Sequence, residues 1–115
     1  MNSIVVSPHY LSSKAGKQIL EIGGNAIDAA IAVNIVQGVV APETCGIGGD
    51  LFALIWKDGF NKPDCLDASG YAGSNVDGSK ISGDTIPLNH PMSVTVPGAV
   101  DGWFTLHERY GSLDI

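Results

Sequence analysis

The sequence predicts an α+β protein built from two adjoining helices, an antiparallel hairpin and a third helix. Three observations lead to this fold class. Two stretches with helical apolar periodicity meet at a Gly-Gly-Asn joint at residues 23–25, a Lys-Asp-Gly turn at 57–59 separates two short apolar runs, and a helical stretch follows Pro97-Gly98. The chain has 115 residues and 44% hydrophobic content, which is ample for one core. We therefore expect a single domain portion, residues 1–115, without an internal linker.

The first elements are expected to be a short strand and an amphipathic helix. The strand covers Ile4–Ser7, and Ser7 then caps a helix that begins at Pro8 and runs to Ile22. Gly23-Gly24 ends this helix, because glycine tolerates the left-handed backbone of a helix C-cap. Its apolar residues recur at spacings of three and four, so they are expected to face the core: Leu11, Ala15, Ile19 and Ile22.

The second helix, at residues 26–41, is predicted to be enclosed by protein, because apolar residues occupy nearly every face. Asn25 is expected to cap it, with Asp28 returning a hydrogen bond in a capping box. Pro42 ends it, since proline favours an extended residue before it. A membrane span would need about 20 apolar residues in a row. Asp28, Asn34 and Gln37 interrupt the run, so we expect no contact with a membrane.

A hairpin, a loop, a strand and a helix complete the chain. Leu51–Trp56 is interpreted as a buried strand, and the turn at Asp58-Gly59 predicts a partner strand at about 64–67. Residues 69–89 are rich in Gly, Ser, Asp and Asn, which predicts a loop or mobile flap of the kind that meets substrates. A short strand at 93–96 and a helix at 99–110 follow. Four side chains of that helix are expected to pack inward: Val100, Trp103, Phe104 and Leu106.

Composition excludes several classes of function. The formal net charge is -6 with only six Lys and Arg, so no basic face for nucleic acid is expected. Cys45 and Cys65 lack CxxC spacing and are expected to be free, buried thiols. His9, His90 and His107 share no metal-ligand spacing, so neither a metal nor a cofactor is expected. No basic segment leads into a long apolar stretch at the N-terminus, which predicts a cytoplasmic protein without a secretory signal.

The Gly-rich turn at residues 46–50 has two interpretations. A phosphate-binding loop would need a preceding strand and a following Gly-Lys-Ser/Thr, and the sequence has neither. We expect instead that these glycines allow two backbones to pass closely.

Several linked motifs resemble one known family. These motifs are Val-Val-Ser at residues 5–7 and the helix that follows it with AGKQIL, then in order GGNAIDAAIA, APETCGIGGD, LDAS and VPGAVDGWFTLHERYG. Together they resemble the large subunit of the gamma-glutamyltranspeptidase family of N-terminal-nucleophile hydrolases. The resemblance implies a four-layer αββα sandwich, of which this chain supplies the N-terminal part. It also implies two partners, the remainder of the large subunit and the small subunit.

The resemblance implies acyl transfer from gamma-glutamyl or related amides, of the glutathione type, through a threonine freed by self-cleavage. No catalytic residue is expected in this chain, because its threonines are internal and none lies in a stretch resembling the family's cleavage site. The chain alone is therefore expected to be inactive, as part of a longer enzyme. The unfinished element at residues 112–115 favours that reading over a non-catalytic binding or assembly piece, which stays the alternative.

The expected substrate-binding residues are Ser69 and Tyr71. The family places an arginine soon after the Leu-Asp of the second hairpin strand, where it pairs with the α-carboxylate of a glutamyl substrate. Ser69 stands at that place, or Tyr71 does in the Ser-Gly-Arg version of related acylases, so the cation is missing either way. Its absence favours an amidase or acylase of different acyl specificity. The structural alternative is an ordinary turn, capped by Asp67, with Tyr71 covering the core.

Overall fold

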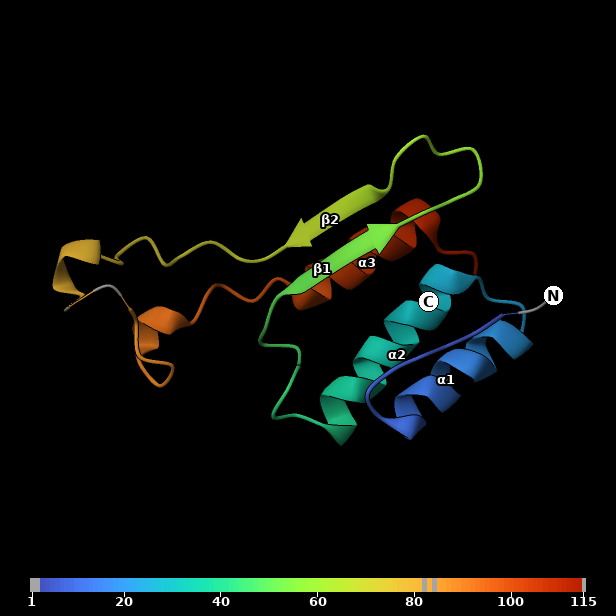
Figure 1. The fold of residues 1–115 in the computed structure, drawn as a ribbon, viewed down its shortest axis with the longest axis horizontal. Coiled ribbons are helices and arrows are strands. Elements are labelled where there is room, and N and C mark those ends of the chain that lie inside the picture. The colour runs from blue at the N-terminus through green and yellow to red at the C-terminus, as the bar shows by residue number, and fades with distance from the viewer. Residues whose placement is uncertain (1–2, 82, 84, 115) are drawn as a thin grey trace.

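A computed structural model describes residues 3–81, 83 and 85–114, and within them it contains three α-helices and one two-stranded sheet (Figure 1). The elements follow in the order α1 (Tyr10–Glu21), α2 (Ala26–Val40), β1 (Leu51–Ile55), β2 (Asp64–Ala68), the 3-10 helices η1 (Gly78–Lys80) and η2 (Pro91–Ser93), and α3 (Ala99–Tyr110). The expected combination of helices with an antiparallel hairpin is confirmed.

The N-terminal segment is extended but forms no strand, so the strand expected at Ile4–Ser7 is wrong. An extended segment becomes a strand only when a neighbour completes its hydrogen bonds, and the described sheet pairs β1 with β2 alone. Helix α1 begins at Tyr10 rather than Pro8, because His9 is its cap. The Nδ1 atom of His9 accepts a hydrogen bond from the Leu11 amide at 3.2 Å.

Helix α1 packs on α2 through small residues. Its buried residues are Ser12 and Gly16, whereas Leu11 and Ile22 of the expected apolar stripe are exposed. A Cβ atom at Gly16 would lie 3.3 Å from the carbonyl oxygen of Ala29, so glycine allows the two helices to approach closely. The expected stripe is therefore wrong at two of its four positions, and α1 presents small rather than large side chains to its neighbour.

Helix α2 begins with the predicted capping box. The Asn25 side chain accepts hydrogen bonds from two amides of the first turn, and Asp28 Oδ2 accepts one from the Asn25 amide at 2.8 Å. Further along, the buried Gln37 accepts a hydrogen bond from Ser12 Oγ at 2.9 Å, which joins α2 to α1. Polar residues that interrupt the apolar run thus fix how α2 starts and how it docks.

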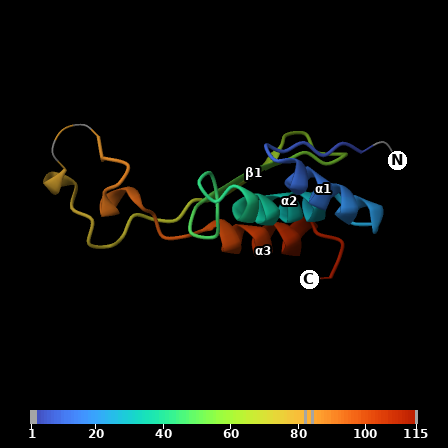
Figure 2. The same ribbon diagram turned by 90° about the horizontal axis from the view of Figure 1, so that it is seen from below.

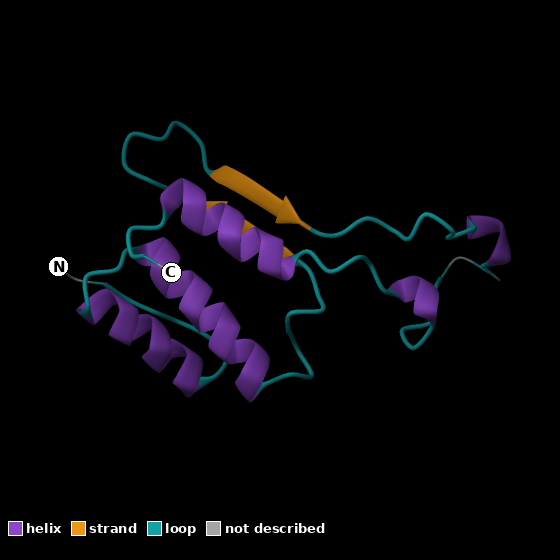
Figure 3. Cartoon of the chain, turned by 180° about the vertical axis from the view of Figure 1, so that it is seen from behind, coloured by secondary structure: helices purple, strands orange, loops and turns teal. Residues whose placement is uncertain are grey.

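The hairpin lies with one face against α3, and α2 lies between α3 and α1 (Figures 2 and 3). Strands β1 and β2 are antiparallel, with Leu51 opposite Ala68 and Ile55 opposite Asp64, as expected from the turn at Gly59, where φ is +85°. The connection contains the short-range hydrogen bond from the Phe60 amide to Lys57 that the turn signal predicts. One core joins the hairpin to α2 and α3: Ile31, Leu51, Ile55, Ala99 and Leu106.

Two apolar faces of the described residues are not enclosed. On α2, Ile35 and Val39 are exposed, so the expectation of a helix enclosed on all sides is wrong for this part of the chain. On β1, Phe52 and Leu54 alternate outward while their neighbours point inward, so only one face of the strand is buried. Cys65, opposite Leu54, is also exposed, which corrects the expectation of a buried thiol there.

Helix α3 covers the predicted residues and is capped by Gly111, but its inward face differs from the expected one. Leu106 is buried, and Trp103 is half-buried and donates its indole N–H to Asn34 Oδ1 of α2 at 2.8 Å. Val100 and Phe104 are exposed, so these two expectations are wrong. The buried residues of α3 are Ala99, Gly102 and Leu106, at spacings of three and four, so small residues fill two of the three buried positions.

The described residues between 72 and 94 project from the body as a long arm (Figure 1). The predicted loop at 69–89 is confirmed for its described residues, with η1 as a short 3-10 turn inside it, and residues 82 and 84 of this range lie outside them. The strand expected at 93–96 is wrong: Pro91–Ser93 forms η2, and the segment after it makes one backbone hydrogen bond to Tyr71 rather than a ladder. Among the described residues, no helix combines the length and apolar character needed to cross a membrane.

Candidate functional site

Three stretches of chain meet where α3 begins, and we name this meeting point the glycine junction: Gly49-Asp50, Ser69–Tyr71 and Thr95–Ala99. The carbonyl oxygen of Gly49 accepts hydrogen bonds from the Gly98 amide at 3.1 Å and the Ala99 amide at 3.0 Å. The first amides of a helix have no partner within the helix. The turn that precedes β1 therefore supplies the acceptor that anchors the start of α3.

Glycine is required at two positions of the junction because backbones pass there in contact. A Cβ atom at Gly70 would lie 1.4 Å from the carbonyl oxygen of Val96, and one at Gly98 would lie 2.1 Å from that of Ala68. Neither glycine has a positive φ angle, so lack of space rather than backbone conformation excludes a side chain. The expectation that the glycines of residues 46–50 allow a close approach is wrong, because a Cβ atom at Gly46 or Gly48 would meet nothing within 4 Å and one at Gly49 would lie 3.5 Å from the carbonyl oxygen of Gly46. The tight approaches of the junction are at Gly70 and Gly98 instead.

Asp50 connects the other two stretches of the junction. Its Oδ1 atom accepts hydrogen bonds from the Gly70 amide at 3.3 Å and from Thr95 Oγ1 at 2.8 Å. One residue further along each stretch, the Val96 amide donates to the carbonyl oxygen of Tyr71 at 3.0 Å. The carboxylate thus lies between segments that are 20 and 45 residues away in the sequence.

The two predicted substrate-binding residues lie at this junction. The Ser69 amide donates to Asp67 Oδ1 at 2.9 Å, which confirms the turn that Asp67 was expected to cap. Tyr71 is 89% exposed, so the alternative in which its ring covers the core is wrong. The junction therefore presents Tyr71 to the surroundings from a backbone that is held on both sides. Binding of substrate by Ser69 and Tyr71 stays a prediction.

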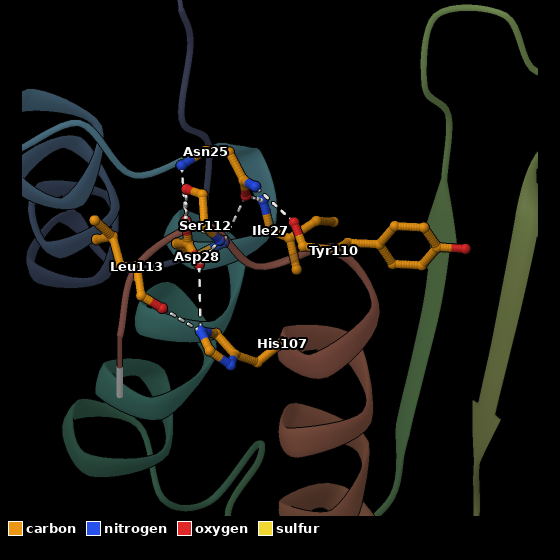
Figure 4. A network of polar contacts seen from close by, with 7 residues as sticks. All are labelled: Asn25, Ile27, Asp28, His107, Tyr110, Ser112 and Leu113. Carbon is orange, nitrogen blue, oxygen red and sulfur yellow. Dashed lines mark hydrogen bonds and ion pairs between the residues drawn. The ribbon is translucent and has the colours of Figure 1, made fainter.

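A second polar cluster lies at the opposite end of α3 and is centred on Asp28 (Figure 4). Asp28 is 7% exposed. Its carboxylate accepts hydrogen bonds from the Asn25 amide at 2.8 Å, the Ser112 amide at 3.1 Å and Ser112 Oγ at 2.6 Å. The Nε2 atom of His107 lies 3.8 Å from Asp28 Oδ1 and 2.6 Å from the carbonyl oxygen of Leu113. We name these residues the Asp28 cluster.

The charge of Asp28 is stabilised by its hydrogen bonds. Burial raises the pKa of this carboxyl group, but the hydrogen bonds from Ser112 and Asn25 outweigh it and hold the pKa below its usual value. The negative charge of Asp28 also lies in the first turn of α2, where the helix dipole favours it. The cluster therefore fixes the end of α3 to the start of α2.

The Asp28 cluster contains serine, histidine and aspartate but does not have the geometry of a catalytic triad. In a triad the imidazole accepts the proton of the serine hydroxyl, and the aspartate orients the imidazole. Here the Ser112 hydroxyl donates directly to Asp28, and the His107 Nε2 atom faces the carbonyl oxygen of Leu113. The cluster is thus structural, and it contains no activated nucleophile.

The remaining candidate residues have local roles. His90, like His9, uses Nδ1 to cap a short helix, accepting from the Met92 amide at 3.1 Å. Cys45 is half-buried and, like Cys65, free, as the spacing predicts. Across residues 3–81, 83 and 85–114, no three His, Cys, Asp or Glu side chains gather as metal ligands would.

Sequence reasoning missed Asp50, Thr95 and Gly98 as members of the site. A carboxylate directly before a strand is the available signal for Asp50, because it can accept the amides left unpaired at the end of a sheet. Nothing local marks Thr95, whose contact depends on the return of a distant segment.

Comparison with known proteins agrees with the motifs. The family model described as gamma-glutamyltranspeptidase matches residues 12–115. The glutathione hydrolase-like YwrD proenzyme of Bacillus subtilis is 43% identical over 114 residues, which cover 97% of this chain and 22% of the relative. This chain spans about a fifth of the length of the first curated relatives that it matches.

Solved structures give the same result. A gamma-glutamyltranspeptidase of Helicobacter pylori superposes with a TM-score of 0.87 at 30% identity, over 97% of this chain and 34% of that one. A cephalosporin acylase from Bacillus halodurans superposes with a TM-score of 0.79 at 41% identity, over 90% of this chain and 20% of that one. The arrangement of helices and hairpin is therefore shared with enzymes that are named for different substrates.

Proposed function

The chain belongs to the gamma-glutamyltranspeptidase family, and from this premise we propose that it is the N-terminal portion of the large subunit of a self-processing threonine amidohydrolase or acyltransferase. The substrates would be gamma-glutamyl or related amides. The nucleophile would be a threonine outside residues 1–115, freed by cleavage so that its own amine serves as base. Residues 1–115 by themselves would be inactive.

The observation that carries this proposal is the position of the Ser69–Tyr71 segment. In the family, this segment follows the second hairpin strand and contacts the acyl group. Here its backbone is held by hydrogen bonds to Asp67, Asp50 and Val96, while the Tyr71 side chain is exposed. A fixed backbone with an outward side chain suits a binding residue, because little conformational freedom is lost when the substrate arrives.

The acyl group is proposed to differ from glutamyl. A carboxylate is bound best by the planar fork of an arginine guanidinium. Ser69 and Tyr71 offer hydroxyl groups and an aromatic face but no positive charge. The similarity to a cephalosporin acylase supports this specificity, since that neighbour is named for an acyl substrate of another kind.

The complete fold is proposed to be the four-layer αββα sandwich. Only one face of the described hairpin is covered, and Phe52 and Leu54 are exposed on the other. Monomeric proteins rarely leave a contiguous apolar face open. A second sheet from the remainder of the large subunit and the small subunit would cover that face, and further protein would cover Ile35 and Val39 on α2.

The test begins with the intact mass of the protein expressed from its complete reading frame. We expect two chains, the smaller beginning with threonine. A single species near 11.9 kDa would instead support the non-catalytic alternative. If two chains form, hydrolysis of gamma-glutamyl-p-nitroanilide is compared with that of 4-aminobutyryl-p-nitroanilide, which lacks the α-carboxylate.

We expect the two anilides to have similar kcat/KM values because the arginine is absent. Since a hydrogen bond to a charged group contributes roughly 1.5–3 kcal/mol, a preference of about 10-fold or more for the glutamyl compound would mean that a cation binds the carboxylate after all. That result would contradict the proposed acyl specificity while leaving the enzyme class intact.

A further inference from the structure

We infer that Asp50 is a positioning residue for the Ser69–Tyr71 segment and acts together with Thr95. This inference rests on the proposed function, because it gives Asp50 a part in binding the acyl group. Asp50 is not one of the two predicted binding residues. Its carboxylate reaches the Ser69–Tyr71 segment from another stretch of the glycine junction.

The register of the sheet sets where its backbone pairing ends. Leu51 pairs with Ala68 at the open end of the hairpin, and this is the last pair of the ladder. Asp50 and Ser69 are the first residues outside it. Beyond that point the backbone of β1 no longer supplies partners. The Asp50 side chain continues the pairing by accepting the Gly70 amide at 3.3 Å.

Three successive residues of the segment are then held by three different stretches of chain. The Ser69 amide binds Asp67 at 2.9 Å, the Gly70 amide binds Asp50, and the Tyr71 carbonyl accepts the Val96 amide at 3.0 Å. The first contact is within a local turn and would persist without tertiary structure. The other two set where the segment lies relative to the rest of the molecule.

Asp50 controls both of these tertiary contacts. Its Oδ1 atom also accepts the hydroxyl of Thr95 at 2.8 Å, and Thr95 directly precedes the residue that binds Tyr71. The Gly70 backbone lies against Val96 with no room for a side chain. A single oxygen atom therefore holds the two backbones at the separation that fixes the direction of the exposed Tyr71 side chain.

The test uses the complete protein with three substitutions. Asp50→Ala removes the acceptor, Asp50→Asn keeps a side-chain oxygen that can accept both hydrogen bonds, and Thr95→Val removes the donor while leaving the carboxylate in place. Asp58→Ala is the matched control, because Asp58 is an exposed carboxylate in the turn between the strands. Steady-state hydrolysis of gamma-glutamyl-p-nitroanilide and hydrogen exchange of peptides that cover residues 69–73 are measured for each.

For Asp50→Ala we expect KM to rise about 10-fold, because a hydrogen bond to a charged acceptor is lost, while kcat changes by less than about 2-fold. Exchange at residues 69–73 should become faster. Asp50→Asn should restore both values toward wild type, Thr95→Val should change them in the direction of Asp50→Ala, and Asp58→Ala should change neither.

Two results would overturn the inference. One is unchanged KM and unchanged exchange at 69–73 in both Asp50→Ala and Thr95→Val. The other is faster exchange throughout β1, β2 and α3, which would make Asp50 a residue of general stability. If wild-type protein hydrolyses no anilide, the proposed function fails, and the exchange measurement alone decides whether Asp50 positions the segment.

Discussion

The two ends of α3 are anchored in the same chemical manner but in different surroundings. At its start, Asp50 is exposed and joins a segment that carries candidate binding residues. At its end, Asp28 is buried and joins the chain after α3 to the first turn of α2. Both carboxylates accept a distant backbone amide and a distant hydroxyl. The same two kinds of contact therefore serve stability where water is excluded, and they leave a segment available to a ligand where it is not.

The largest effect is expected from breaking the buried end. Asp28→Ala removes the acceptor for the Asn25 and Ser112 amides and for the Ser112 hydroxyl. We expect the free energy of unfolding of the complete protein to fall by about 3 kcal/mol, since hydrogen bonds to charged groups are the strongest ones. Urea unfolding followed by tryptophan fluorescence measures the loss.

The control for this change is Asp101→Ala, which removes an exposed carboxylate from the first turn of α3. Its only expected cost is the helix-dipole contribution of about 0.5 kcal/mol. Equal losses for the two variants would mean that burial gives Asp28 no special weight, and the contrast between the ends of α3 would disappear.

A steric change at the exposed end should have the next largest effect. A methyl group at Gly70 would collide with the Val96 carbonyl, so the two backbones must separate. We expect Gly70→Ala to lower stability by about 2 kcal/mol, in the range typical of overpacking, and to abolish amide hydrolysis. Differential scanning fluorimetry and an anilide assay measure the two effects.

Gly73→Ala provides the comparison, because a Cβ atom there would meet its nearest neighbour, a methyl group of Val76, at 3.7 Å. That variant should keep wild-type stability and activity. A Gly70→Ala protein that behaved in the same way would show that the close approach at the junction is not needed.

A change of charge at the junction should alter specificity with little effect on stability. Tyr71→Arg places a guanidinium group on an exposed side chain whose backbone is held by Val96. We expect the preference for gamma-glutamyl-p-nitroanilide over its 4-aminobutyryl analogue to rise by about 10-fold, because an arginine–carboxylate pair forms two charged hydrogen bonds. Tyr71→Lys, which has the charge but not the fork, should gain less. No gain with either variant would place the acyl carboxylate away from Tyr71.

The smallest effect concerns pH and belongs to the buried end. The folded pKa of Asp28 lies below the ordinary 3.8, so its stabilising contribution is complete above that pH and is lost as the pH falls through the folded value. The stability difference between wild type and Asp28→Asn should therefore be constant from neutral pH down to about pH 5 and should shrink only below pH 4. Urea unfolding at a series of pH values measures it. A difference that already shrinks between pH 7 and 5 would mean that the Asp28 carboxyl group is not the source of the effect.

Much of the local structure was determined by the sequence itself. Asn25 and Asp28 are three residues apart, so their capping box forms within one helical turn. The turn at Gly59 and the helix after Gly98 likewise depend on a few adjacent residues, and these elements were predicted with nearly correct bounds. The order of the motifs was also sufficient to indicate the family, because each one is a local string of residues.

What only the tertiary structure decided involves partners far away in the chain. Residues 4–7 and 93–96 have strand-like sequences, yet they are not strands in the described part of the chain because no neighbour completes their hydrogen bonds. The buried face of α1 contains Ser12 and Gly16 because α2 approaches closely, which helical periodicity does not indicate. The Asp28 cluster joins two residues that are separated by 84 positions in the sequence. Asp50 binds two residues that lie 20 and 45 positions after it. Periodicity and propensity act over a few residues, whereas these contacts exist only after packing has brought the segments together.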